Sequence, residues 1–320
     1  MRDPAILLGG GRMKAAKRAF TAAALSLGLA ASAVAQSSVI ELERTASGYF
    51  VAPVFIGTDG PYPFAPDTGA SHTAIAQSLA EAHGFISTQD RLDAVQTLTA
   101  EVQAERHGLV DLRLGPLPLG EIDTVVTPTP PDLQLELFGL LGSNAFTGHV
   151  IKLDYPQARL TVDAQQPRYA DARIDPVRQV LVGAAQARRI EDDIAVLIDT
   201  GSPITLVNHA LARRLNQRTP VSVVNVGNMT RIPNPVETED RVILSQFRMG
   251  GVCLRRIAVS EADLDVFRAM GWDNRPAMIV GLDLLQSTAL TIDFETGRAQ
   301  IDPGPETWRC PGDRRAQLSH

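Results

Sequence analysis

Two aspartates in identical Asp-Thr-Gly triplets are the residues best suited to chemistry in this chain. They are Asp67 and Asp199, and each triplet follows a short apolar run. A single triplet is weak evidence, because roughly a tenth of one is expected by chance at ordinary residue frequencies. Two carboxyls held close together cannot both ionise, so they share a proton. One can then act as a base on water while the other acts as an acid.

The two triplets belong to an internal repeat. Six sequence features recur in the same order after each triplet. Their spacing matches best after the short apolar segments that end at Gly142 and Gly281. Asp154 and Asp293 each lie 12 residues beyond their glycine. A repeat of this kind indicates two copies of one structural unit, so the two aspartates are expected to occupy equivalent positions.

The repeat also sets the expected domain organisation. The first copy covers residues 36–164 and the second covers 176–305. Between them, residues 165–175 are polar, contain a proline and lack an apolar period, so they are interpreted as a linker. Residues 306–320 are interpreted as a polar tail. Short apolar segments alternate with turns rich in Gly, Pro and Asp, which predicts mainly β structure with a few short helices.

On these residues the chain resembles the aspartic proteases of the pepsin and retropepsin clan, over roughly residues 38–303. The clan's signature is Asp-Thr-Gly followed by two hydrophobic residues and Gly, which here are Leu140-Leu141-Gly142 and Ile279-Val280-Gly281. The resemblance implies a mainly β fold with two pseudo-symmetric, closed barrel-like lobes in one chain. It also implies a monomeric endopeptidase that cleaves a polypeptide substrate with water activated between Asp67 and Asp199.

The resemblance assigns supporting roles as well. Thr68 and Thr200 would hydrogen-bond across a pseudo-twofold axis to the backbone of the opposite lobe. Gly142 and Gly281 would pack beneath the catalytic loops. The remaining supporting residues are the triplet glycines, which let the backbone pass closely, and one hydroxyl: Gly69, Gly201 and Ser202.

The two copies differ around their aspartates. Pro66 precedes Asp67 and cannot donate a ladder hydrogen bond, so the first catalytic strand must tolerate a missing bond there. Ser202 follows the second triplet where the first has Ala70. We therefore expect Asp199 to ionise more readily and Asp67 to hold the shared proton.

Flap hairpins are expected in both copies. The candidate in the first copy spans about 95–108 and lacks the tyrosine of pepsin-type flaps, which favours the retropepsin style. Its equivalent in the second copy spans about 223–242.

Composition excludes several other functions. The net charge is −6 and the basic residues are scattered, so nucleic acid is not expected as a partner. The histidines lack metal-ligand spacing, and neither a metal nor a cofactor is expected. His72 lies five residues after Asp67 and is interpreted as a polar residue at the start of the following segment. A catalytically silent peptide-binding module on the same scaffold remains the alternative function.

The N-terminus predicts export. From Met13 the chain has a basic start, an uncharged run and a small-residue end at Ala35, as in a secretory signal, with residues 1–12 as an over-extended start. The alternative is an uncleaved membrane anchor. After cleavage we expect a periplasmic or secreted protein without a membrane segment. In such a protein the only two cysteines, Cys253 and Cys310, are more typical of a structural disulfide than of a metal site.

Overall fold

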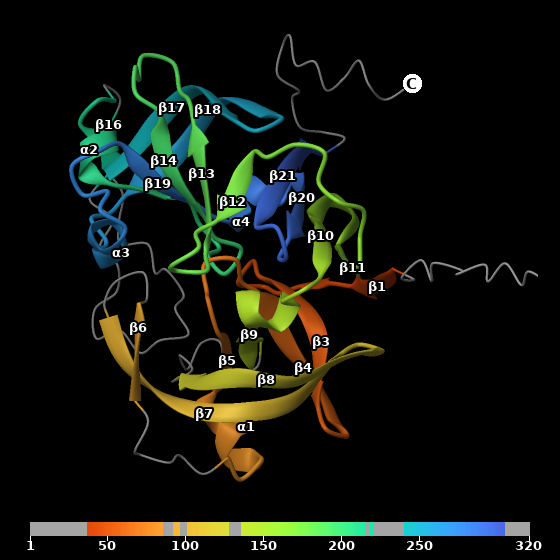
Figure 1. Cartoon of the computed structure of the whole chain (residues 1–320). Helices are drawn as coiled ribbons and strands as arrows, with labels where there is room; N and C mark the ends of the chain where they lie inside the picture. Colours follow the sequence, from red (N-terminus) through yellow and green to blue (C-terminus); the bar gives the residue numbers. More distant parts are fainter. Residues whose placement is uncertain are drawn as a thin grey trace, which may run out of the picture. The chain divides into compact units, whose positions relative to one another are not determined.

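The computed structural model describes residues 37–85, 92–96, 101–127, 136–215, 218–220 and 240–304. Within these ranges the protein is mainly β with a few short helices, which confirms the predicted fold class (Figure 1). None of the helices in these ranges has the length and apolar character needed to cross a bilayer. The predicted leader (1–35) and tail (306–320) lie outside the described residues.

The first half of the chain forms a closed six-stranded barrel. Its strands pair in the order β3-β4-β9-β5-β8-β7, and pairing of β3 with β7 closes the ring, while β2 and β6 extend it at the edges. The strands are β2 (Glu43–Arg44), β3 (Phe50–Ile56), β4 (Asp59–Pro66), β5 (Thr73–Ala76), β6 (Leu92–Gln96), β7 (Glu101–Leu114), β8 (Leu117–Thr127) and β9 (Gly139–Leu141). Two short helices accompany them, α1 (Gln77–Ala82) and the 3-10 helix η1 (Ser143–Phe146).

The second half repeats this pairing pattern. β14 pairs in parallel with β19 as β4 does with β9, and β15 pairs with β18 as β5 does with β8. Its strands are β13 (Leu181–Ala185), β14 (Ile194–Ile198), β15 (Leu206–Val207), β16 (Arg218–Pro220), β17 (Asp240–Met249), β18 (Val252–Glu261) and β19 (Ala277–Val280). Its helices are α2 (His209–Ala212), α3 (Asp265–Ala269) and α4 (Leu282–Leu285). The repeat in the sequence is therefore also a repeat of strand topology.

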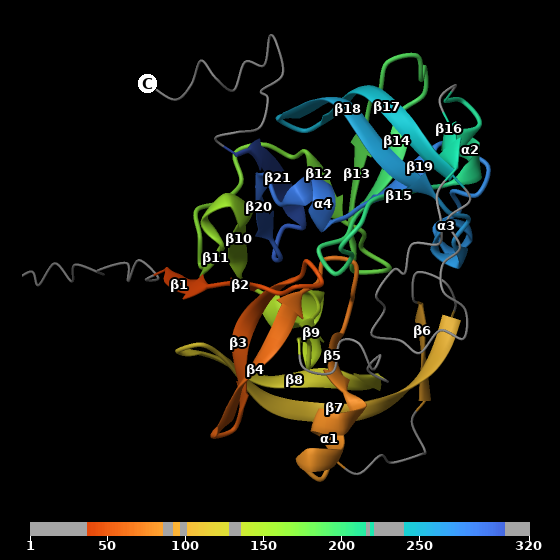
Figure 2. The same cartoon turned by 180° about the vertical axis from the view of Figure 1, so that it is seen from behind.

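A shared sheet joins the halves, with strand order β1-β11-β10-β20-β21-β12, and it continues through the pairing of β12 with β13 into the strands of the second half, which makes 13 strands in the described residues (Figure 2). Its members are β1 (Ser38–Glu41), β10 (Val150–Asp154), β11 (Arg159–Val162), β12 (Ala172–Ile174), β20 (Thr288–Asp293) and β21 (Arg298–Pro303), with the 3-10 helix η2 (Tyr155–Gln157) between β10 and β11. The segment interpreted as a linker, residues 165–175, contributes β12 to this sheet.

The centre of the shared sheet coincides with the pseudo-twofold axis. β10 pairs antiparallel with β20, and Lys152 lies opposite Thr291. The 139-residue offset that relates Gly142 to Gly281 also relates Lys152 to Thr291. A residue that pairs with its own repeat equivalent lies on the axis, so the axis passes between these two strands.

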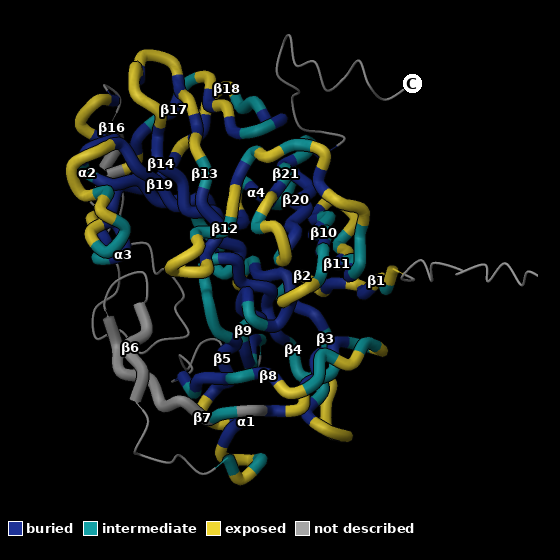
Figure 3. The backbone as a smooth tube through the Cα atoms, in the orientation of Figure 1, coloured by how far each residue is buried: buried dark blue, intermediate teal, exposed yellow. Residues whose placement is uncertain are grey.

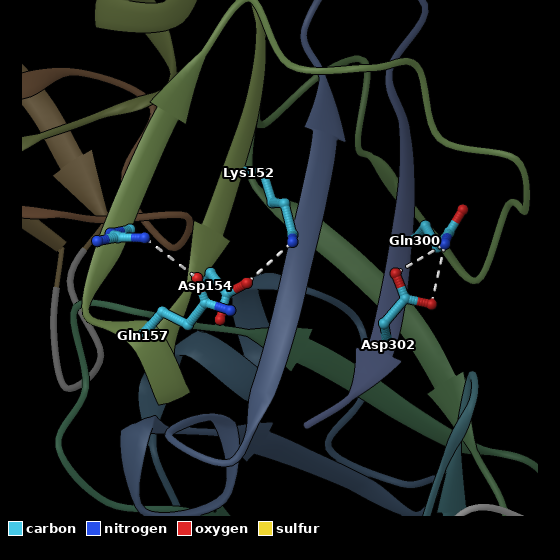
Figure 4. Close-up of polar contacts among 6 residues, drawn as sticks. Lys152, Asp154, Gln157, Gln300 and Asp302 are labelled. Atoms are coloured by element: carbon cyan, nitrogen blue, oxygen red, sulfur yellow. Dashed lines mark hydrogen bonds and ion pairs between the residues drawn. The ribbon is translucent and has the colours of Figure 1, made fainter. Parts of the chain in front are cut away.

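Apolar side chains fill the space on the inner side of the strands. All five residues of β14 and all four of β19 are buried, as the dark blue tube of Figure 3 shows. Such continuous apolar runs are typical of strands covered on both faces. The outward face of the shared sheet is polar. Lys152 Nζ lies 2.9 Å from Asp154 Oδ2, and Gln300 Nε2 donates to Asp302 (Figure 4). Partly exposed pairs of this kind contribute little stability.

Candidate active site

The two aspartates lie at equivalent strand ends. Asp67 follows β4 and Asp199 follows β14. Asp67 N donates to Leu141 O at 2.9 Å, and Asp199 N donates to Val280 O at 3.0 Å. The residues are only 8% and 5% exposed, so both carboxyls sit in a poorly hydrated environment.

Pro66 does not disturb the first copy. The pairing of β3 with β4 begins at Ala52 opposite Phe64, so Pro66 lies beyond it. The missing N–H therefore falls where that ladder has already ended. The first catalytic strand thus tolerates the missing bond, and Pro66 still pairs with Leu141 of β9.

The two threonines of the triplets hold each other across the axis. Thr68 N donates to Thr200 Oγ1 at 3.0 Å, and Thr200 N donates to Thr68 Oγ1 at 3.2 Å. Each hydroxyl also donates to the opposite half, Thr68 Oγ1 to Ile198 O at 2.6 Å and Thr200 Oγ1 to Pro66 O at 2.7 Å. This reciprocal set of four buried hydrogen bonds fixes the two catalytic loops relative to each other.

Each triplet glycine lies against the aspartate of the other half. A Cβ added to Gly69 would lie 2.7 Å from Asp199 Cγ, and one added to Gly201 would overlap the Asp67 carboxyl. Within its own half, Gly69 N donates to Asp67 Oδ1 and Gly201 N donates to Asp199 Oδ1, both at 2.8 Å. Any side chain at these two positions would push the carboxyls apart.

The landmark glycines also pack as the resemblance implies. A Cβ added to Gly142 would collide with the backbone of His72, and one added to Gly281 would collide with the backbone of Ile204. These glycines thus lie directly against the segments that follow the triplets. Their close packing fixes the position of the catalytic loops relative to β9 and β19.

A supporting pair in each half was not anticipated. Asn144 Oδ1 accepts from Thr73 N at 2.8 Å and from Thr73 Oγ1 at 2.9 Å. In the second half, Thr205 Oγ1 donates to Asp283 Oδ1 at 2.6 Å. Both acceptors follow their landmark glycine by two residues, and both threonines follow their aspartate by six. That shared spacing was the signal that could have identified them.

Burial controls the electrostatics of the aspartate pair. It raises the pKa of Asp67 and raises that of Asp199 well above the usual value, and the charge of Asp67 raises the pKa of Asp199 further. The hydrogen bonds from Gly69 N and Gly201 N oppose these shifts. Because two close carboxyls cannot both ionise readily, the pair retains one proton over a wider pH range than a solvated carboxyl.

The expected role of Ser202 is wrong. Its hydroxyl donates to Ile204 O at 2.9 Å and not to Asp199. Asp199 therefore lacks the hydroxyl that was expected to favour its charged form, and which of the two aspartates holds the shared proton stays a prediction. The serine instead shapes the turn after the triplet.

Tyr155 adds an unexpected polar group beneath the pair. It is 4% exposed, and its ring centroid lies 4.9 Å from that of Phe50. Burial raises the pKa of its hydroxyl, which faces Thr200. The repeat equivalent of Tyr155 is Phe294, so this hydroxyl is present on one side of the axis only.

The candidate flap of the first half is a two-stranded ribbon. β6 pairs antiparallel with β7 from Leu92 opposite Glu105 to Gln96 opposite Glu101. In the second half β16 and β17 pair in the same way, but residues 221–239 of the predicted second flap lie outside the described residues.

Two further sequence predictions concern cysteines and metals. Cys253 lies in β18, whereas Cys310 lies outside the described residues, so their disulfide stays a prediction. In the described ranges, no group of His, Cys, Asp and Glu side chains is arranged to hold a metal ion.

Comparison with known proteins gives one family. A family model described as aspartyl protease matches residues 52–145, a segment that contains Asp67, the β6–β7 ribbon and Gly142. No curated protein matches the chain. Asp199 lies beyond the matched segment, and its place in the fold rests on the repeated strand topology and the contacts across the axis. Residues 52–145, less than a third of the chain, are therefore similar to aspartyl proteases.

Proposed function

We propose that this protein is an aspartic endopeptidase whose catalytic residues are Asp67 and Asp199. The observation that carries the proposal is the pair of buried carboxyls beside the pseudo-twofold axis, in loops that the Thr68–Thr200 hydrogen bonds fix to each other. A site for binding alone does not need two mutually repelling carboxyls in a dry environment. A shared proton between them provides the base and the acid that amide hydrolysis requires.

The proposed reaction uses both protonation states of the pair. The ionised carboxyl takes a proton from water, and the water oxygen attacks the peptide carbonyl carbon. The neutral carboxyl gives its proton to the carbonyl oxygen, which yields a tetrahedral gem-diol. As the C–N bond breaks, the carboxyl that took the water proton gives it to the leaving amine. The other carboxyl takes a proton from a hydroxyl of the gem-diol, which becomes the C=O of the product acid, so the pair recovers its starting state. The glycine N–H groups at 2.8 Å keep the carboxyl oxygens oriented throughout this cycle.

The substrate in this proposal is an extended polypeptide that crosses both halves. The β6–β7 ribbon supports this choice because β7 pairs with β8 only from Glu105 onwards, so residues 101–104 form a two-stranded extension beyond the barrel. We expect the peptide to run between this extension and the aspartate pair. The predicted export signal would place the activity in the periplasm or outside the cell.

Cleavage of denatured proteins by the full-length exported protein, between about pH 3 and pH 7, tests the proposal. We expect Asp67→Asn and Asp199→Asn each to lower the rate by about 10²- to 10⁴-fold. Asp154→Asn, on the outward face of the shared sheet, is the matched control and should keep full activity.

A peptide mimic of the gem-diol distinguishes the proposal from a silent binding module. An assembled pair should bind the mimic far more tightly than the parent peptide, and Asp199→Asn should remove that difference. A wild-type protein that binds peptides, cleaves none and does not prefer the mimic would show that the site only binds.

A further inference from the structure

The residues after the two triplets differ in chemistry at equivalent positions. The 132-residue offset between Asp67 and Asp199 relates Ser71 to Pro203 and His72 to Ile204. All four keep partial solvent contact, whereas Thr73 and Thr205 directly after them are buried again. They are thus solvent-reachable side chains beside the aspartate pair, one set on each side of the axis.

Backbone contacts fix both sets at the same place. His72 lies against Gly142, and Ile204 lies against Gly281, so closely that a Cβ on either glycine would collide with it. Each glycine follows the strand that pairs in parallel with the strand leading into its aspartate, β9 with β4 and β19 with β14. The backbones of His72 and Ile204 therefore lie at matching positions in the two halves.

The His72 side offers hydrogen-bond donors. Ser71 Oγ lies 2.9 Å from His72 Nδ1 and orients the ring. Among the described residues Nε2 has no hydrogen-bond partner, so it is available to a ligand. The loop after β12 meets the same side, because Ser143 Oγ, next to Gly142, donates to Gln179 O at 2.7 Å.

The Ile204 side is apolar. Ile204 packs against the buried cluster that contains Leu206 and Ile279. Pro203 lies next to the loop before β3, where a Cβ on Gly48 would come within 4.0 Å of Pro203 Cβ. Neither side chain offers a hydrogen-bond donor.

We propose that the two sides of the substrate site have opposite preferences. The side formed by Ser71 and His72 binds a substrate side chain with acceptor oxygens, an aspartate or glutamate, and the side formed by Pro203 and Ile204 binds an apolar one. This inference rests on the proposed function and specifies its substrate class. The catalytic contacts are symmetric, whereas the substrate sequence that the site recognises differs on the two sides of the scissile bond.

Cleavage-site profiling with a peptide library tests the inference. In wild-type products, acidic residues should be enriched on one side of the scissile bond and apolar residues on the other. His72→Ile should lower the preference for acidic over apolar residues by about tenfold to a hundredfold, as expected for a lost hydrogen bond to a charged group. His72→Gln retains a donor and should retain most of the preference.

The reciprocal change is the matched control. Ile204→His should create acceptance of acidic residues on the second side, and the double exchange of His72→Ile with Ile204→His should move the preference from one side to the other. Unfolding midpoints of all variants identify any that fail to fold.

The outcomes separate the two proposals. If wild-type protein cleaves but His72→Ile leaves the profile unchanged, or if apolar residues are preferred on both sides, the inference is wrong while the endopeptidase proposal stands. If wild-type protein cleaves nothing, the endopeptidase proposal fails and this inference fails with it.

Discussion

Replacement of Thr200 by valine should strongly destabilise the protein. Thr200 Oγ1 accepts from Thr68 N and donates to Pro66 O, and both bonds are buried. Valine keeps the shape of the side chain but removes the hydroxyl, so one N–H and one C=O stay buried without a partner. Each unpaired group costs about 1–3 kcal/mol, so the variant should lose about 2–6 kcal/mol. This is a large part of the total of about 5–15 kcal/mol typical of native proteins.

Urea unfolding followed by tryptophan fluorescence measures this loss. Thr161→Val, at a partly exposed position of β11, is the matched control and should change the free energy of unfolding by less than about 0.5 kcal/mol. Thr200→Ser keeps the hydroxyl and should retain most of the stability. The reasoning would be refuted if Thr200→Val unfolded at the same urea concentration as Thr161→Val.

Three more predictions concern the site and the cysteines. Because burial raises the pKa of the aspartate pair above the usual 3.8, the pair stabilises the fold fully below that value and less as pH rises through the folded pKa. Between about pH 4 and about pH 7, the thermal stability of Asp199→Asn should therefore fall less than that of the wild type. An equal dependence of the unfolding temperature on pH in the two proteins would contradict this. Gly201→Ala should lower kcat/KM for a peptide by about 10²-fold or more, because the new Cβ displaces the Asp67 carboxyl. A thiol titration of the denatured, unreduced protein should find no free thiol if Cys253 and Cys310 pair, and two if they do not.

Local spacing was enough to predict much of the fold. The repeated triplets and the glycines at 142 and 281 follow from strict steric needs, since a side chain at any of these glycines meets a carboxyl or a backbone. Such steric requirements appear in the sequence as glycines that recur at the same spacing in both copies. The alternation of short apolar runs with turns likewise predicts strands, because strand side chains alternate between core and surface.

The features that the sequence did not predict depend on the direction in which a side chain points, or on a partner that lies far away along the chain. The hydroxyl of Ser202 donates to Ile204 O, and residue type alone does not say which local acceptor a serine chooses. The polar segment 165–175 has too few apolar residues to signal a strand, yet β21 provides an edge on which residues 172 and 173 pair. Asn144 was missed because its partner, Thr73, lies 71 residues away.

The pairing of β10 with β20 also determines how precisely the two halves are aligned with each other. A register shift of one residue would slide one half along the other by about 3.3 Å, which exceeds the whole length of the hydrogen bonds between Thr68 and Thr200. The same shift would turn the buried residues of β10 to its partly exposed face and move the two catalytic loops out of register. The register of two strands outside the catalytic loops therefore sets the spacing of the catalytic atoms.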